Sequence, residues 1–532
     1  MKKFISVILT AIILLSIASP AACAVSSGGI TQTPVIFIRG ASRNLYESDE
    51  VISDETRIFP LDVDLGAHIS NVLKPCLEAL AMGFVTDNFD SYCDELYNAC
   101  APLYENVILD KNGEASDGSG DGTNVYKFDR PRKTSDYGLW DYDFGFDLRL
   151  SPLEIADDLK IYIDLVKEAT GKDKVALVGR CFGGNVISAY LEKYTEHAIE
   201  NVETVIMYIS STVGVDFIGA LFAGKIELNP DNVDRFVEYV SNDMGVIEDK
   251  DMQSLITATV DLLNYAKVLG LGTDALQYII DNVKDNLVPR LALASYGTFP
   301  SYWSMVPTEY FDDAKTMIFS GKEDEYAGLI AKIDEYHNTV QLNYKETMLY
   351  LDSKGVSINV IAKYNLPVIP LYEGADAQSD FIAETRDVTF GATTAPLDET
   401  LSEDYIASLE DTKYVSPDLK IDASTCLFPD RTWFIKDLYH FDFPVTCNSL
   451  LAAIVNSNGQ LTVFDDEAYP QYLVYDTEAD TLTPVTGTDK ERPEKGSNEE
   501  RFSILIRFFT AIMNFFTKLF NGELDLSFGK GE

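Results

Sequence analysis

The chain has 532 residues, enough for one large domain with insertions, and its 46% apolar content excludes a disordered protein. Its formal net charge is −43. So acidic a surface repels phosphates, and we therefore expect no nucleic-acid partner.

The first 24 residues are typical of a secretory signal peptide. Two lysines precede an apolar run over residues 4–17, and Ala-Cys-Ala at 22–24 supplies a small-x-small cleavage pattern. The run is shorter than the roughly 20 apolar residues that a membrane-spanning helix needs. A retained anchor and lipidation of Cys23 are the alternatives. We expect cleavage after Ala24 and a secreted or cell-surface protein, whose net charge becomes 40 − 85 = −45.

Six cysteines follow the signal peptide, and an exported protein can form disulfides. Cys93 with Cys100, or Cys426 with Cys447, are the candidate pairs. The sequence contains no CxxC spacing and only four histidines, which disfavours a zinc site. We expect neither a metal nor a cofactor.

Strand and helix patterns alternate along the chain. Residues 34–40 are a mostly apolar run that ends in glycine, which is typical of a buried strand in a parallel sheet. Further strands are predicted at 140–146, 174–179, 205–210, 356–362 and 432–435. Amphipathic helices are predicted at 152–169, with Ser151 as N-cap, and at 184–194. This alternation predicts an α/β fold with a mostly parallel sheet flanked by helices.

Residues 212–350 show successive helical patterns and few strand signals. We interpret them as a helical cap inserted between sheet strands, with an aromatic loop at 297–303 (Gly-Thr-Phe-Pro-Ser-Tyr-Trp). The Gly-, Asp- and Ser-rich segment 112–123 predicts an exposed loop. The main domain would then span residues 31–458, followed by a β extension at 459–485.

The C-terminal residues differ in character from this domain. Residues 486–500 are charged and contain Gly and Pro, which predicts a linker. An amphipathic helix is expected at 501–521, because apolar residues within 502–520 recur three and four apart. Its cationic, Phe-rich character favours contact with a membrane surface. A terminal helix docked on its own domain fits the pattern equally well.

A Gly-x-nucleophile-x-Gly pattern occurs at residues 179–183, Gly-Arg-Cys-Phe-Gly, between a predicted strand and a predicted helix. In such an elbow the nucleophile occupies a sharp turn, and the glycines avoid collisions with neighbouring backbone. The pattern makes Cys181 the candidate nucleophile, at a helix N-terminus that favours the thiolate. The alternative is an inert buried cysteine in a protein that has lost catalysis.

A cysteine nucleophile needs a base, and imidazole is the usual one. In α/β-hydrolases, where this elbow occurs, the chain order is nucleophile, acid, histidine. His440 follows the last predicted strand and is the best placed of the histidines. The acid stays open among four carboxylates that follow the strand at 356–362: Asp376, Asp380, Asp387 and Asp430.

Several short segments, in order over residues 33–450, resemble the lecithin:cholesterol acyltransferase family. The segments are 34–40 (Pro-Val-Ile-Phe-Ile-Arg-Gly), 142–149 (Tyr-Asp-Phe-Gly-Phe-Asp-Leu-Arg) before Pro-Leu-Glu at 152–154, the elbow at 179–183, the aromatic segment at 297–303 and Gln-Ser-Asp-Phe-Ile at 378–382. The chain departs from the family at two positions. Cys181 replaces the nucleophilic serine, and Phe381 stands where the acidic loop of the family, Asp-Gly-x-Val, has glycine.

The resemblance implies an α/β-hydrolase fold with a helical cap, and it places Cys181, Asp380 and His440 as the catalytic triad. It also implies that the backbone amides of Ala41 and Phe182 stabilise the oxyanion. The implied activity is that of an exported lipid acyl hydrolase or O-acyltransferase, with a thioester on the cysteine and a lipid or other acyl ester as substrate. The alternative function is that of a catalytically silent hydrolase fold that binds lipid or a surface partner.

Overall fold

The computed structural model describes residues 31–40, 44–59, 75–76, 78–80, 82–122, 133–134, 139, 141–243, 273–444, 446–476 and 481–487. The predicted signal peptide, the predicted C-terminal helix, most of the predicted linker and Ala41 lie outside the described residues. The chain divides after Val485 into two units, and the fold below is that of the first.

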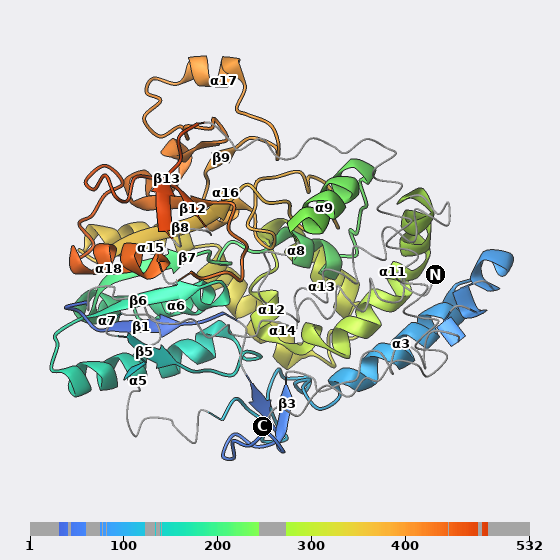
Figure 1. Cartoon of the computed structure of the whole chain (residues 1–532). Helices are drawn as coiled ribbons and strands as arrows, with labels where there is room; N and C mark the ends of the chain where they lie inside the picture. The colour runs from blue at the N-terminus through green and yellow to red at the C-terminus, as the bar shows by residue number, and fades with distance from the viewer. Residues whose placement is uncertain are drawn as a thin grey trace, which may run out of the picture. The chain divides into compact units, whose positions relative to one another are not determined.

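The first unit is built around a nine-stranded mixed sheet (Figure 1). Its spatial order is β13 (Thr481–Pro484), β12 (Tyr472–Asp476), β11 (Thr432–Lys436), β8 (Ser357–Tyr364), β7 (Val202–Tyr208), β6 (Val175–Arg180), β1 (Val35–Ile38), β5 (Asp141–Phe144) and β4 (Lys133–Thr134). The strands from β5 to β12 pair in parallel, whereas β4 and β13 add antiparallel edges. The predicted α/β fold with a mostly parallel sheet is therefore confirmed, and each predicted strand corresponds to an observed one.

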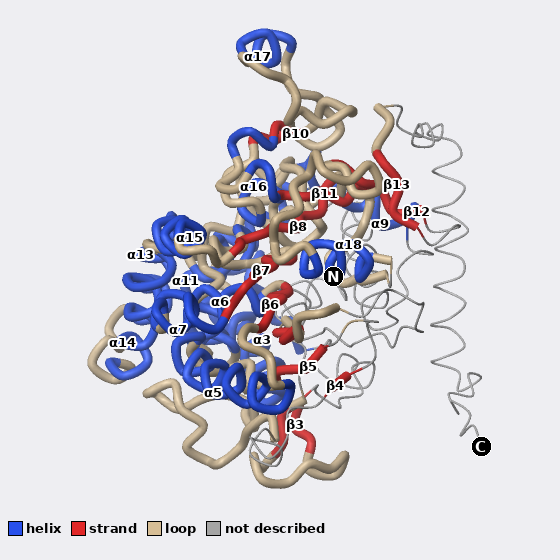
Figure 2. The backbone as a smooth tube through the Cα atoms, turned by 90° about the vertical axis from the view of Figure 1, so that its left-hand side faces the viewer, coloured by secondary structure: helices blue, strands red, loops and turns tan. Residues whose placement is uncertain are grey.

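Helices cover the sheet, which explains why central strands such as β1 and β6 are mostly apolar rather than alternating. Figure 2 shows α5 (Pro152–Thr170), α6 (Phe182–Lys193), α7 (Thr195–Asn201) and α15 (Tyr344–Ser353) on one side of the sheet and α18 (Cys447–Asn456) on the other. Every residue of β8 is buried. The remaining elements outside the segment between β7 and β8 are α3 (Asp90–Tyr104), α16 (Thr385–Val388), α17 (Glu403–Ser408), the strand pairs β2 (Leu45–Tyr46) with β3 (Arg57–Phe59) and β9 (Thr393–Thr394) with β10 (Ile421–Asp422), and the short turns η3 (Ala423–Thr425) and η4 (Pro429–Arg431).

Helix α5 begins where the sequence predicts. The Ser151 side chain accepts a hydrogen bond from the Leu153 amide, and the Glu154 carboxylate accepts one from the Ser151 amide, at 3.1 Å. This reciprocal capping box satisfies two amides that the first helical turn leaves open. The helix ends at Thr170, and its C-cap is Gly171. The Gly171 φ of 67° is a left-handed conformation that glycine adopts readily.

The segment between β7 and β8 contains helices and turns but no strand among its described residues. It comprises α8 (Asp216–Phe222), α9 (Pro230–Asp243), α11 (Thr273–Leu293), η1 (Tyr296–Thr298), α12 (Pro300–Trp303), α13 (Thr308–Phe319), α14 (Ala327–Tyr336), the π-helical turn η2 (His337–Gln341) and α15. We call this segment the cap. No helix among the described residues of the chain is long and apolar enough to cross a membrane.

The predicted aromatic loop at 297–303 is wrong, because these residues form helical turns and are buried. Pro300 starts α12, and the Trp303 indole donates a hydrogen bond to the Gly297 carbonyl at 2.9 Å. The Trp303 ring stacks on Phe319 at 5.2 Å between ring centroids. Apolar packing within the cap thus folds a segment whose Gly, Pro and Ser content suggested a loop.

The predicted disulfides are not formed. Cys93 and Cys100 are separate buried thiols in α3, and Cys426 is a free thiol, so it does not pair with Cys447. Seven residues along a helix separate two Cα atoms by about 10.5 Å. A disulfide requires a Cα separation below about 7 Å, which explains why the first pair cannot form.

The predicted exposed loop at 112–123 is only partly exposed, because Ser119 binds a buried arginine. Arg149 is fully buried and forms an ion pair with Asp147, with an N–O distance of 2.7 Å. The guanidinium also donates to the Ser119 hydroxyl (3.0 Å), the Ser119 carbonyl (3.1 Å) and the Val107 carbonyl (3.2 Å). Arg149 therefore ties the loop to the segment that precedes α5.

Replacing Asp147 with alanine should lower the free energy of unfolding by about 3–5 kcal/mol, because the Arg149 guanidinium would stay buried without a counter-charge. Urea-induced unfolding measures the change. The double variant Asp147→Ala, Arg149→Met removes both charges and should recover part of the loss. A single variant within about 0.5 kcal/mol of wild type, as for an ordinary surface substitution, would contradict a structural role for the pair.

Candidate active site

The elbow predicted at residues 179–183 forms a sharp turn between β6 and α6. Cys181 lies between them with φ 53° and ψ −124°, a strained conformation for a residue with a side chain. The neighbouring backbone is very close, since a Cβ added to Gly183 would lie 2.1 Å from the Ile38 carbonyl oxygen. The turn leaves Cys181 partly exposed at the carboxyl end of β6.

Asp380 and His440 come together at the same edge of the sheet, after β8 and β11 respectively. The His440 Nδ1 and the Asp380 Oδ2 are 2.7 Å apart, and the two side chains are 3% and 1% exposed. The other carboxylate oxygen accepts hydrogen bonds from the amides of Ile382 (3.0 Å) and Ala383 (2.8 Å). Because Asp380 engages Nδ1, the His440 Nε2 remains for the nucleophile.

Cys181 and His440 lie close enough to shift each other's pKa. Burial acts to raise the pKa of the thiol, but the charge and hydrogen bond of His440 and the Phe182 amide outweigh it, so the thiol pKa falls below its usual value of 9.0. Burial acts to lower the pKa of His440, but Asp380 and Cys181 raise it to about 9. These shifts favour a thiolate–imidazolium pair near neutral pH.

The rival acids do not contact His440 in the described structure. The Asp387 carboxylate faces the Arg386 guanidinium at 3.4 Å. Asp430 lies in the turn before β11 and accepts a hydrogen bond from the Tyr414 hydroxyl. The structure therefore brings only Asp380 of the four candidates to the histidine.

The amide of Phe182, the first predicted oxyanion donor, helps to lower the pKa of the Cys181 thiol. The second predicted oxyanion donor, Ala41, is outside the described residues, but its neighbour Gly40 is described. A Cβ added to Gly40 would lie 3.1 Å from the Cys181 Cβ and 3.6 Å from its sulfur. The turn after β1 therefore packs directly against the nucleophile.

Two cations that the sequence analysis did not single out hold the loop that carries His440. The Arg180 guanidinium donates to the carbonyls of His440 (3.0 Å) and Phe441 (2.7 Å). The Lys363 ammonium, at the end of β8, donates to the carbonyls of Tyr439 (2.6 Å), His440 (3.2 Å) and Asp442 (2.7 Å). Burial and the charge of Arg180 lower the Lys363 pKa to about 8. The available signal was a single charged residue in an otherwise uncharged strand.

Replacing Arg180 with methionine should lower kcat of a reaction that uses His440 by about 10²-fold, because a displaced His440 loop misaligns the imidazole. Steady-state kinetics of the purified variant measure the change. Lys174→Met is the matched control, since the Lys174 ammonium also donates to two backbone carbonyls, those of Ile199 and Val202. The control should keep the wild-type kcat. An unchanged kcat in Arg180→Met would show that the His440 loop does not need this contact.

Aromatic side chains flank the nucleophile. Tyr302 of α12 is buried and interacts electrostatically with Cys181. Its ring stacks on Tyr296, with centroids 4.6 Å apart. The Phe182 ring, next to Cys181 in the chain, packs against Phe146 with centroids 5.8 Å apart. The cap thus contributes a buried aromatic side chain that interacts with the thiol.

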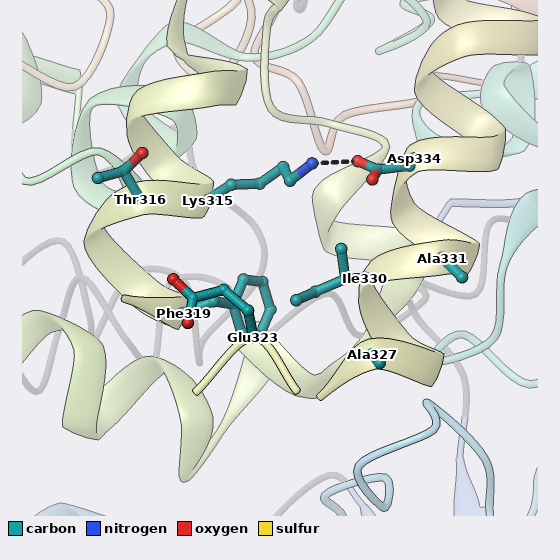
Figure 3. Close-up of a pocket in the computed structure, with 8 residues that line it drawn as sticks. All are labelled: Lys315, Thr316, Phe319, Glu323, Ala327, Ile330, Ala331 and Asp334. Atoms are coloured by element: carbon teal, nitrogen blue, oxygen red, sulfur yellow. Dashed lines mark hydrogen bonds and ion pairs between the residues drawn. The ribbon is translucent and has the colours of Figure 1, made fainter. Parts of the chain in front are cut away.

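A separate pocket of about 490 Å³ lies between α13 and α14 of the cap (Figure 3). It is lined by Lys315, Thr316, Phe319, Glu323, Ala327, Ile330, Ala331 and Asp334. Lys315 and Asp334 form an ion pair across it. None of the residues that carry the proposed chemistry lines this pocket.

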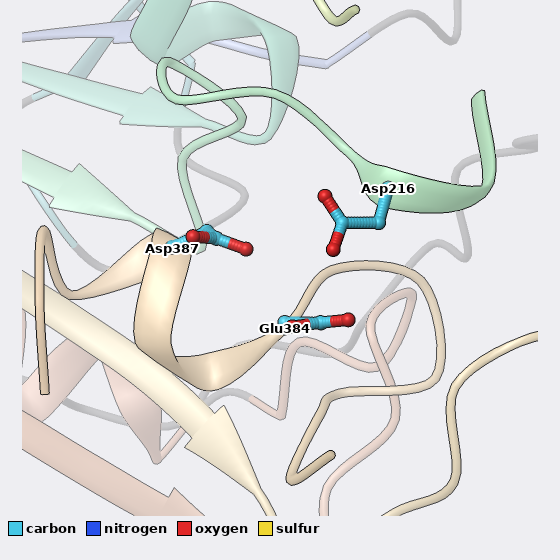
Figure 4. Close-up of side chains that lie close together, drawn as sticks. All are labelled: Asp216, Glu384 and Asp387. Atoms are coloured by element: carbon cyan, nitrogen blue, oxygen red, sulfur yellow. The ribbon is translucent and has the colours of Figure 1, made fainter. Parts of the chain in front are cut away.

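Three carboxylates, those of Asp216, Glu384 and Asp387, offer oxygen atoms within 4.8 Å of one another (Figure 4). Among the described residues, these three carboxylates lie close enough together to hold a metal ion. The Arg386 guanidinium lies 2.6 Å from both Asp216 and Glu384 and supplies a positive charge to the cluster. Burial and Asp216 raise the Asp387 pKa to about 7. The cluster links α8 of the cap to the segment that follows Asp380.

No protein-family model matches the chain, and no curated protein matches its sequence. The functional assignment therefore depends on the geometry of Cys181, His440 and Asp380.

Proposed function

We propose that the chain is an acyl-ester hydrolase or O-acyltransferase of the α/β-hydrolase fold, which acts on lipid or other acyl esters through Cys181, His440 and Asp380. The observation that carries the proposal is the hydrogen bond between His440 and the Asp380 carboxylate, together with the electrostatic coupling of His440 to the Cys181 thiol. The nucleophile stands on a strained elbow between a strand and a helix, as in nucleophile elbows generally.

The order of the three residues supports the hydrolase assignment. Cys181, Asp380 and His440 follow β6, β8 and β11, which are strands of one parallel sheet. Nucleophile, acid and histidine occur in this chain order in α/β-hydrolases. Because parallel strands end at the same edge, residues that lie 259 positions apart (440 − 181) reach one site.

The first half of the reaction transfers the acyl group to the protein. The Cys181 thiolate attacks the ester carbonyl carbon, and the negative charge moves to the carbonyl oxygen. The Phe182 amide, with Ala41 as the proposed second donor, stabilises this oxyanion, which is worth about 10²–10³ in rate per donor. The His440 imidazolium then protonates the departing alkoxide, the carbon–oxygen bond breaks, and a thioester remains on the cysteine.

The second half releases the acyl group. Neutral His440 accepts a proton from water or from an acceptor alcohol as its oxygen attacks the thioester carbonyl. Collapse of this second tetrahedral intermediate breaks the carbon–sulfur bond and restores the thiolate. Asp380 stabilises the imidazolium formed in this step. Water yields a free acid and an alcohol yields a new ester, so the same residues serve hydrolysis and transfer.

The partly exposed thiol and its lowered pKa support a reactive cysteine over the alternative of an inert one. The signal-peptide pattern at residues 1–24 supports export. The cationic amphipathic pattern at 502–520 supports contact with a membrane surface, where lipid esters occur. Export and membrane contact are part of the proposal.

The proposal is tested with p-nitrophenyl esters of increasing acyl length, with and without glycerol as an acceptor. The full chain should release nitrophenolate, and His440→Gln should lose nearly all of this rate. The matched control is His197→Gln, because His197 also contacts an aspartate, Asp164, at 3.1 Å. An acyl-glycerol product identified by mass spectrometry would assign transfer, and free acid alone would assign hydrolysis. Equal rates in wild type and His440→Gln would refute the proposal.

A further inference from the structure

Phe381, the residue directly after Asp380, has a φ of 90°. Bulky side chains rarely adopt this conformation, and such strain persists only where the surroundings hold it in place. The residue lies in a tight turn, since the Asp380 amide donates to the Ala383 carbonyl at 3.2 Å. The Phe381 amide itself donates to the Ser379 hydroxyl at 3.0 Å.

This turn sets the direction of the catalytic carboxylate. It presents the amides of Ile382 and Ala383 to one oxygen of Asp380 and leaves the other oxygen for His440. Asp380 and His440 are also joined through their backbones, because the His440 amide donates to the Asp380 carbonyl at 2.8 Å. A change of backbone conformation at Phe381 would therefore rotate the carboxylate that orients the imidazole.

The Phe381 ring is buried between the cap and the loop that carries His440. It stacks on Phe236 of α9, with centroids 5.1 Å apart and planes at 23°. Its edge contacts Tyr439, the residue before His440, at 5.5 Å and 61°. Packing against these two rings supplies the restraint that the strained backbone requires.

The segment that follows Asp380 has a second contact with the cap. Arg386 forms an ion pair with Asp216 of α8 at 2.6 Å. Helix α9, which carries Phe236, is fixed in turn by the Tyr239 hydroxyl, which donates to the Asp398 carboxylate at 2.7 Å. The cap therefore contacts this segment through an aromatic stack and through an ion pair.

We propose that Phe381 is a positioning residue, whose packing against Phe236 and Tyr439 holds the turn that aligns Asp380 with His440. The inference rests on the proposed function, because it concerns the same pairing of histidine and cysteine. It assigns Phe236 of the cap a part in setting the reactivity of Cys181.

The test measures the rate at which iodoacetamide alkylates Cys181 in the full chain as a function of pH, by mass spectrometry of the peptide that contains it. The wild-type thiol should titrate below 9, and Asp380→Asn should raise its apparent pKa. Phe381→Ala and Phe236→Ala should each raise this pKa by about one unit, as expected when an ion pair is weakened. Combining them should add little further shift, because both act through one contact.

Phe89→Ala is the control for the loss of a buried ring, since Phe89 packs against Phe84 and Tyr278, away from the triad residues. It should lower the melting temperature and leave the Cys181 pKa unchanged. If Phe381→Ala fails to fold, the Cys181 pKa in Phe236→Ala decides whether the inference holds, because this variant leaves the sequence of the turn intact.

The outcomes separate the inference from the function on which it rests. A lowered wild-type pKa that rises in Asp380→Asn but stays unchanged in Phe381→Ala and Phe236→Ala would overturn the role of Phe381 and leave the triad standing. A wild-type Cys181 that titrates near 9 would overturn both. A rise in both phenylalanine variants with no change in Phe89→Ala is the result that supports the inference.

Discussion

Replacing Cys181 with alanine should reduce kcat for aryl-ester hydrolysis by about 10⁴–10⁶-fold, which leaves only what oxyanion stabilisation and binding contribute. The reason is that the covalent path disappears, and His440 has no partner positioned to attack the acyl carbon. Release of p-nitrophenolate from a short-chain ester measures the loss. Folding should be retained, because a partly exposed thiol contributes little to core packing.

Cys426→Ala is the control, since it removes a buried thiol that contacts none of the triad residues in the described structure. It should keep the wild-type kcat. Cys181→Ser tests the thiolate itself: a serine hydroxyl is not ionised by His440 in the ground state, so its rate should fall below that of the wild type. Full activity in Cys181→Ala would remove the cysteine from the mechanism.

Replacing Asp380 with asparagine should lower kcat by about 10³–10⁴-fold, because an amide cannot stabilise the imidazolium and favours the wrong histidine tautomer. The pH profile should change in a defined way. Without the carboxylate, the pKa of His440 falls from about 9, and the Cys181 pKa rises as its partner loses charge. The thiolate–imidazolium pair exists only between these two pKa values.

The pH range of activity in Asp380→Asn should therefore narrow from both sides. The measurement is kcat/KM between about pH 5 and 10, whose limbs report the free-enzyme pKa values. Asp376→Asn is the matched control at a rival carboxylate and should leave both limbs in place. Equal profiles for wild type and Asp380→Asn would mean that another group orients the histidine.

The fold could be predicted from the sequence where local signals agree with the packing. The runs at 174–179 and 356–362 are mostly apolar because both faces of the sheet are covered. The start of α5 follows from a capping box within four residues. The helical turns at 297–303 could not be predicted, because their stability comes from rings of other cap helices, Phe222 of α8 and Phe319 of α13.

The candidate site was predictable only in part. The Gly-x-Cys-x-Gly pattern identifies Cys181 as the candidate nucleophile. The position of His440 after the last predicted strand favours it as the base. Residue types alone left the acid open among four carboxylates, because all four follow the strand at 356–362. Arg180, Lys363 and Phe381 were not predicted as parts of the site, since their contacts with the His440 loop depend on how distant strands end.

A thioester on Cys181 is detected most directly by mass spectrometry of the protein after rapid acid quench during turnover of a p-nitrophenyl ester. We expect an acyl group on the peptide that contains Cys181, released by hydroxylamine as a thioester and missing in Cys181→Ala. Turnover of the ester with the acyl group on a different residue would contradict this expectation.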